Sequence, residues 1–109
     1  MDPALAPNRA TPWLAVEDRR ATRVHLGLPV TIARDGPAAA PAMMIDVSRF
    51  GCRLTGAPRQ TVGSLVTIHV KHFTSLEGWV AWDEAGVSGL DFAHPVPEPI
   101  VSHLASFTR

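Results

Sequence analysis

Cysteine and lysine are scarce in this chain, and tyrosine is missing altogether. The single cysteine, Cys52, cannot form an internal disulfide, and a reducing compartment suits such a chain. The formal net charge is zero, which argues against binding to nucleic acid or to a membrane through bulk charge. An oligonucleotide-binding barrel would show a basic groove with interleaved aromatic side chains. Neutral charge without tyrosine disfavours that class.

Long apolar runs are also absent. No stretch is long and apolar enough to span a bilayer, so no membrane insertion is expected. The N-terminus carries Asp2 and prolines where the apolar part of a signal peptide would lie. The sequence therefore predicts a cytoplasmic protein. Its 109 residues, 46% of them hydrophobic, are enough for one domain with a small core.

No arrangement of residues typical of catalysis or metal binding is found in the sequence. His69 and His72 are three residues apart, a spacing that on a strand points side chains to opposite faces and does not suit a shared metal. Ser48 and Cys52 stand in no nucleophile motif, and no glycine-rich phosphate loop precedes a helix. We therefore expect no enzyme, no metal site and no cofactor, with Cys52 as a buried small hydrophobe.

Hydrophobic residues that alternate with a period of two predict an all-β domain. The alternation is strict over residues 24–32, although Pro29 predicts an open edge or a bulge there. Ile100, Leu104 and Phe107 recur at helical spacing after Pro99. Six short strands followed by one short helix predict a small antiparallel barrel. The expected elements are strands at 24–32, 43–48, 52–55, 65–71, 79–83 and 88–93, and a helix at about 100–107.

Residues 1–16 lack this periodicity and contain several prolines. They are predicted to form a flexible N-terminal segment, with the folded domain at residues 17–109.

A pair of arginines, Arg19-x-x-x-Arg23, stands where the domain begins, with Arg20 between them. Arginine offers a planar fork of donors that suits a phosphate or the O6/N7 edge of guanine. Glu17 and Asp18 precede the pair, so a solvated segment of mixed charge with weak local ion pairs is the alternative interpretation.

A second motif, Asp46-x-Ser48-x-x-Gly51, follows two dozen residues later. Strict alternation places Asp46 and Ser48 on one strand face, together with Met44. Asp46 can accept hydrogen bonds from guanine N1–H and N2–H, and Ser48 can donate or accept. Gly51 permits a positive φ and a close approach of the backbone. Asp and Ser before a Gly also build turns through side-chain to backbone hydrogen bonds, and that role is compatible with ligand binding.

In this order, the two motifs resemble those of the PilZ domain, a bacterial receptor module for the second messenger cyclic di-GMP. Residues 78–82 (Gly-Trp-Val-Ala-Trp) and 89–92 (Gly-Leu-Asp-Phe) are similar to segments of late PilZ strands. The resemblance covers roughly residues 17 to 107. It implies a six-stranded barrel with a C-terminal helix, and a ligand on the barrel exterior beneath the arginine-bearing N-terminal loop.

For function, the resemblance implies a non-enzymatic receptor. Cyclic di-GMP would order the N-terminal arginine loop, and this change would signal to a downstream effector protein, with no DNA or RNA partner. The alternative is a PilZ-like protein–protein adaptor that binds no nucleotide. The implied ligand-binding residues are Arg19, Arg20, Arg23, Asp46, Ser48 and Gly51.

Two tryptophans in one expected strand are further candidates for stacking on a guanine base. Trp79 and Trp82 are expected on opposite faces of the strand. Val80 shares the face of Trp82, so Trp82 is expected to lie partly in the core, and the sequence leaves open which of the two meets a ligand.

Overall fold

The computed structural model describes residues 23–34 and 38–107. The predictions for the N-terminal segment, for Arg19 and for Arg20 lie outside these residues.

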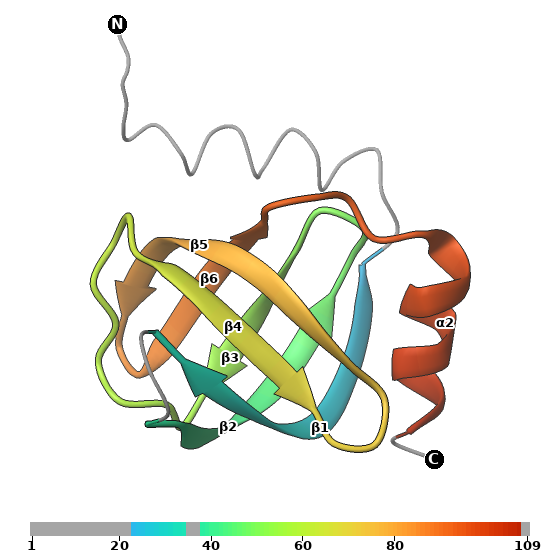
Figure 1. The fold of residues 1–109 in the computed structure, drawn as a ribbon, viewed down its shortest axis with the longest axis horizontal. Helices are drawn as coiled ribbons and strands as arrows, with labels where there is room; N and C mark the ends of the chain where they lie inside the picture. Colours follow the sequence, from blue (N-terminus) through green and yellow to red (C-terminus); the bar gives the residue numbers. More distant parts are fainter. Residues whose placement is uncertain (1–22, 35–37, 108–109) are drawn as a thin grey trace, which may run out of the picture.

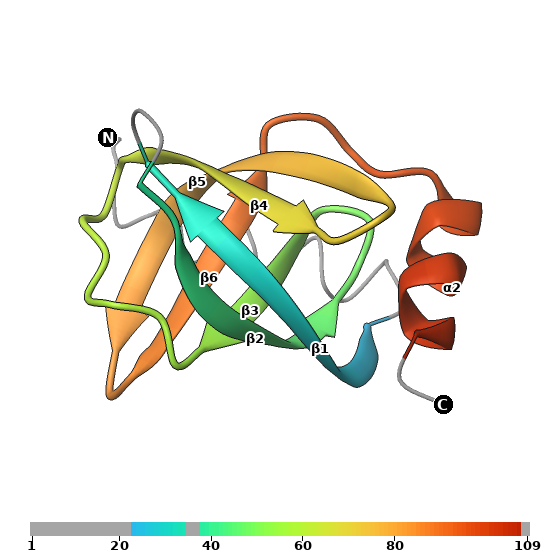
Figure 2. The ribbon, with the colours of Figure 1, turned by 60° about the horizontal axis from the view of Figure 1, so that its bottom comes forward.

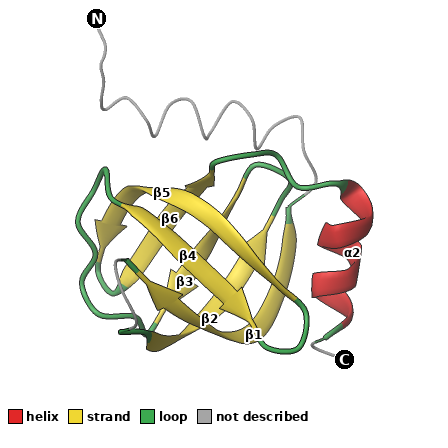
Figure 3. Cartoon of the chain, viewed as in Figure 1, coloured by secondary structure: helices red, strands yellow, loops and turns green. Residues whose placement is uncertain are grey.

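Six strands form a closed barrel in the order β1-β2-β3-β6-β5-β4, and every neighbouring pair is antiparallel (Figure 1). Helix α2 lies at one end of the barrel, which a second view confirms (Figure 2). The expected all-β class, a six-stranded antiparallel barrel with a short C-terminal helix, is therefore confirmed (Figure 3). The elements are β1 Val24–Ala33, β2 Ala40–Val47, β3 Gly51–Thr55, β4 Leu65–Val70, β5 Thr74–Glu84, β6 Val87–Phe92 and α2 Glu98–Ser106.

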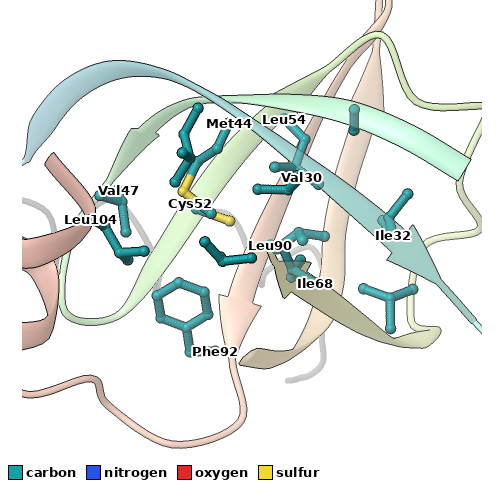
Figure 4. Packing of buried hydrophobic residues seen from close by; sticks show 14 of the residues in the cluster. Val30, Ile32, Met44, Val47, Cys52, Leu54, Ile68, Leu90, Phe92 and Leu104 are labelled. Atoms are coloured by element: carbon teal, nitrogen blue, oxygen red, sulfur yellow. The ribbon is translucent and has the colours of Figure 1, made fainter. Parts of the chain in front are cut away.

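The barrel interior holds one hydrophobic core built from all six strands and the helix (Figure 4). In β1 the predicted alternation is confirmed, because Leu28, Val30 and Ile32 are buried and Pro29 is exposed. The pairing of β1 with β4 covers Thr31–Ala33, so Pro29 has a ladder partner only on the β2 side, as an open edge there requires. Its irregularity lies between His25 and Leu28, next to Pro29.

Two further bulges change which side chains face the core. The register of β2 against β3 shifts between Met44 and Asp46, and that of β5 against β6 shifts between Val80 and Trp82. A bulge inserts one extra residue and reverses the alternation beyond it. Met44 and Val47 therefore both face the core, which strict alternation does not allow.

Strand β5 starts at Thr74, five residues before the expected start at Trp79. A tight turn at residues 71–73 connects it to β4, with His72 at a φ of 62°. A Cβ at Gly78 would come within 2.9 Å of the Asp91 carbonyl oxygen, so the close approach of β6 requires a glycine there.

Helix α2 packs against the barrel through Val101 and Leu104, both buried. Near its C-terminal end, the rings of His103 and Phe107 lie 4.6 and 5.7 Å from the Phe73 ring in the β4–β5 turn. The helical spacing identified Leu104 and missed Val101, which is almost fully buried.

Candidate functional site

Asp46 lies on the outer side of the barrel wall, although none of its surface is exposed to solvent. Its neighbour Val47 belongs to the core, and its partner across β3 is Arg53. Cys52 and Leu54 flank Arg53 and are both in the core, so Arg53 and Asp46 face outward together. The prediction that Asp46 shares a face with Met44 is wrong, because the bulge between them reverses the alternation.

Two arginines enclose the Asp46 carboxylate. Arg23 Nη1 donates to Oδ1 at 2.8 Å, and Arg53 Nε donates to Oδ2 at 2.6 Å, with a second ion-pair contact from Arg53 Nη2. The side chains of Arg23 and Arg53 are 20% and 37% exposed, so neither is fully buried. A buried carboxylate needs such paired, hydrogen-bonded cations to offset its desolvation.

This contact brings the two sequence motifs together. Arg23 precedes β1, and the β1–β2 register pairs Val24 with Val47, so the arginine lies beside Asp46 although 23 residues separate them. Arg53 was not predicted as a site residue. Its signal in the sequence was its position two residues after Gly51, on the strand face opposite Cys52 and Leu54.

Ser48 builds the connection between β2 and β3. Its Oγ accepts a hydrogen bond from Phe50 N–H at 3.2 Å, and its N–H donates to the Gly51 carbonyl at 2.9 Å. The residue is fully buried. Ser48 therefore builds a turn through side-chain to backbone hydrogen bonding, as considered from the sequence, and these bonds hold the loop at residues 48–51.

The same loop is attached to the segment that leads into α2. Val96 N–H donates to the Arg49 carbonyl at 2.7 Å, and Arg49 Nε donates to the Val96 carbonyl at 3.1 Å. Phe92 N–H donates to the Phe50 carbonyl at 2.9 Å, and the Arg49 guanidinium lies 5.3 Å from the Phe50 ring centre. These hydrogen bonds attach the loop of the Asp-x-Ser-x-x-Gly motif to the end of β6 and to the segment before α2.

Gly51 opens β3 opposite Asp91. In the described part of the chain, the glycines with positive φ are Gly56, Gly63 and Gly86, so the expected use of a positive φ at Gly51 is not found. Gly51 instead leaves a position without a side chain on the outer face of β3, next to Arg53.

Both tryptophans of β5 lie on the outer face, so the expectation that they point to opposite faces is wrong. Trp79 pairs with Asp91, and Trp82 pairs with Gly89, two residues away on the same face of β6. A Cβ at Gly89 would overlap the Trp82 indole, so this ring lies directly over the glycine. Trp79 is 48% exposed. The bulge after Val80 causes the difference from strict alternation.

Cys52 is no candidate nucleophile. It is buried in the core, and burial, with the charge of Asp46 in second place, raises the pKa of its thiol far above the ordinary value. Among the residues with described positions, no three His, Cys, Asp or Glu side chains form a group that could hold a metal ion. Within the same residues, no helix is long and apolar enough to cross a bilayer.

Comparison with models of known protein families identifies the family of this chain. No curated protein matches the chain. A family model described as the PilZ domain matches residues 17–109, which is more than half of the sequence. The match includes both arginine positions, the Asp-x-Ser-x-x-Gly motif, all six strands and α2. The chain therefore belongs to the PilZ domain family.

Proposed function

We propose that this domain is a non-enzymatic receptor for cyclic di-GMP. PilZ domains form a family of cyclic di-GMP-binding domains, and this chain is a member. The observation that carries the proposal for this chain is the contact of Arg23 with Asp46, because it joins the two motifs into one polar site on the barrel exterior.

Arg23 and Arg53 would supply the cationic part of the site. Each guanidinium can offer N–H donors to a phosphate or to a guanine O6/N7 edge while a carboxylate fixes its orientation. Asp46 is fully buried beneath them, so its first role in this proposal is to position the two arginines. A ligand would reach the Asp46 oxygens only if one arginine moved aside.

The loop of the Asp-x-Ser-x-x-Gly motif, residues 48–51, would contact the remainder of the ligand. The hydrogen bonds of Ser48 hold this loop, and Gly51 adds no side chain to the outer face of β3 beside Arg53. Arg19 and Arg20, which precede the described residues, would close over the ligand from the N-terminal side. That ordering, relayed to a downstream protein, would be the signal.

Titration calorimetry with cyclic di-GMP tests the proposal, with GTP and cyclic di-AMP as controls for specificity. Arg23→Ala and Arg53→Ala should each weaken binding by about ten- to a hundredfold, because each removes a charge-assisted contact. Arg59→Ala is the matched control, since Arg59 is exposed and lies in the loop between β3 and β4.

Cyclic di-GMP that binds to the wild type and the Arg59 variant, and much less to the other two variants, would support the proposal. A folded wild-type protein that gives no heat at saturating ligand would overturn it. The adaptor alternative would then remain.

A hydrogen-exchange comparison tests the ordering step. With cyclic di-GMP bound, the protection of backbone amides from exchange should rise most at residues 17–24 and 48–51. It should change little in β4, which is paired with neither β2 nor β3. Residues 17–24 that are equally protected without ligand would show that the arginine loop is already formed.

A further inference from the structure

Asp91 is a carboxylate on the outer face of the barrel, within the Gly-Leu-Asp-Phe segment and outside the arginine and Asp-x-Ser-x-x-Gly motifs. It lies in β6 between Leu90 and Phe92, which both face the core, so its own side chain faces outward. Its Oδ1 atom is buried and has no hydrogen-bond partner. Native proteins pair nearly all of their buried polar atoms, so an unpaired carboxylate oxygen indicates a role outside the resting fold.

Its place in the sheet puts Asp91 beside the candidate site. On one side its strand partner is Gly51, the last residue of the Asp-x-Ser-x-x-Gly motif, and on the other side it is Trp79. Gly51 has no side chain that could pair with the carboxylate. Asp46 and Asp91 are two strands and two residues apart, or roughly 12 Å at standard sheet spacings.

We propose that Asp91 is a second carboxylate of the ligand site and accepts hydrogen bonds from a guanine base of cyclic di-GMP. The inference rests on the proposed function and names the atom that would read the base. The N1–H and N2–H groups of guanine are adjacent donors, and one carboxylate can accept both. Both oxygens of Asp46 already accept from arginines, whereas Oδ1 of Asp91 has no donor.

The side chain can reach a ligand from its observed position. Asp91 is only half-buried as a residue, and the terminal torsion of an aspartate is broad, so the carboxylate can rotate to present an oxygen to a ligand. The exposed Trp79 side chain stands across from it on β5. A base that enters between Gly51 and Trp79 would meet the carboxylate at its edge.

A protonation equilibrium makes this role measurable. Burial raises the pKa of Asp91 from 3.8 to about 6. The charged and titratable groups on the neighbouring elements are Arg53 and Arg49 on the β3 side, Glu77 on β5 and His94 beyond β6. Burial is the cause of the shift. Guanine donors favour the ionised carboxylate, so binding would release its proton.

The experiment is a calorimetric titration with cyclic di-GMP at about pH 7.5 and about pH 5.5, in buffers of different ionisation enthalpy. Wild-type affinity should be about fourfold lower at the acidic pH, with release of about 0.8 proton per site there. Asp91→Asn should bind about tenfold more weakly at neutral pH, since an amide places a donor against one guanine N–H, and should not release this proton. Glu84→Gln, at the exposed end of β5, is the charge-matched control and should match the wild type.

The outcomes separate the two proposals. A wild type that binds no cyclic di-GMP overturns the receptor function and this inference with it. A wild type that binds, with an Asp91→Asn variant of equal affinity and equal proton release, overturns only the role of Asp91. Weaker binding by the variant with unchanged proton release also overturns it, because Asp91 would then act only through the structure of the sheet. The variant should fold, since the buried Oδ1 of Asp91 has no hydrogen bond to lose.

Discussion

Replacement of Asp46 by alanine should lower the stability of the unliganded domain, because the structure makes this carboxylate the centre of an ion-pair group. Asp46 is completely buried and accepts from Arg23 and Arg53. Removal of one partner of a buried ion pair typically costs about 3–5 kcal/mol. Here the two arginines are 20% and 37% exposed and can regain hydration, so we expect a loss of about 2 kcal/mol.

The loss can be measured by urea unfolding followed through tryptophan fluorescence. For a domain of this size, about 2 kcal/mol corresponds to a Tm lower by roughly 10 °C. Glu84→Gln is the control, because it removes a carboxylate charge from an exposed position at the hairpin end of β5. This variant should unfold at nearly the wild-type urea concentration.

A double-mutant cycle then assigns the loss to the ion pairs. In an Arg53→Ala background, Asp46→Ala should cost less than in the wild type, with a coupling free energy of about 1–2 kcal/mol. An Asp46→Ala protein as stable as the wild type would refute the reasoning. It would mean that the desolvation of the carboxylate cancels the attraction of both arginines.

Three further predictions concern stability without ligand. Ala85→Asn should raise the free energy of unfolding in urea by about 0.5–1 kcal/mol, and a less stable variant would contradict the reasoning. Ala85 and Gly86 form the two-residue β5–β6 turn with φ angles of 53° and 81°, and Asn-Gly suits such a turn better than Ala-Gly. Gly89→Ala should displace the Trp82 ring, shift its fluorescence towards that of solvent-exposed indole and lower the Tm by several degrees, whereas an unchanged spectrum and Tm would show that the ring does not lie on the glycine. Protonated Asp91 stabilises the fold below its unfolded-state pKa of 3.8, and this contribution is lost as the pH rises through the folded-state pKa of about 6. The free energy of unfolding should therefore fall between these pH values in the wild type and fall less in Asp91→Asn, whereas parallel pH profiles of the two proteins would contradict the raised pKa.

The hydrophobic pattern predicted the barrel because most of its strands have one face in the core and one face towards solvent. In β1 this period of two survives the bulge, and Val24 and Leu26 still pack against the core that Leu28, Val30 and Ile32 fill. The start of β5 was missed because its first residues are half-buried or exposed and give a weak alternation before Gly78.

The tryptophans show where a purely local pattern fails. A bulge forms where one strand has more residues than its partner between the same two paired positions. In β5 the extra residue is Ala81, because Val80 pairs with Leu90 and Trp82 pairs with Gly89. The expected split of Trp79 and Trp82 between two faces follows from counting along one strand. The partner strand moves Trp82 onto the outer face over Gly89.

Local periodicity and residue types at fixed spacings were enough to predict the fold class, the family and the two motifs. The contacts of the motif residues, by contrast, depend on how the strands pair. Barrel closure and the β1–β2 and β2–β3 registers bring Arg23 and Arg53 onto Asp46, from positions 23 and 7 residues away. The β3–β6 register sets Asp91 beside Gly51, and Oδ1 of Asp91 has no hydrogen-bond partner there. Strand pairing is a long-range property, so side chains distant in sequence become neighbours only when the sheet closes.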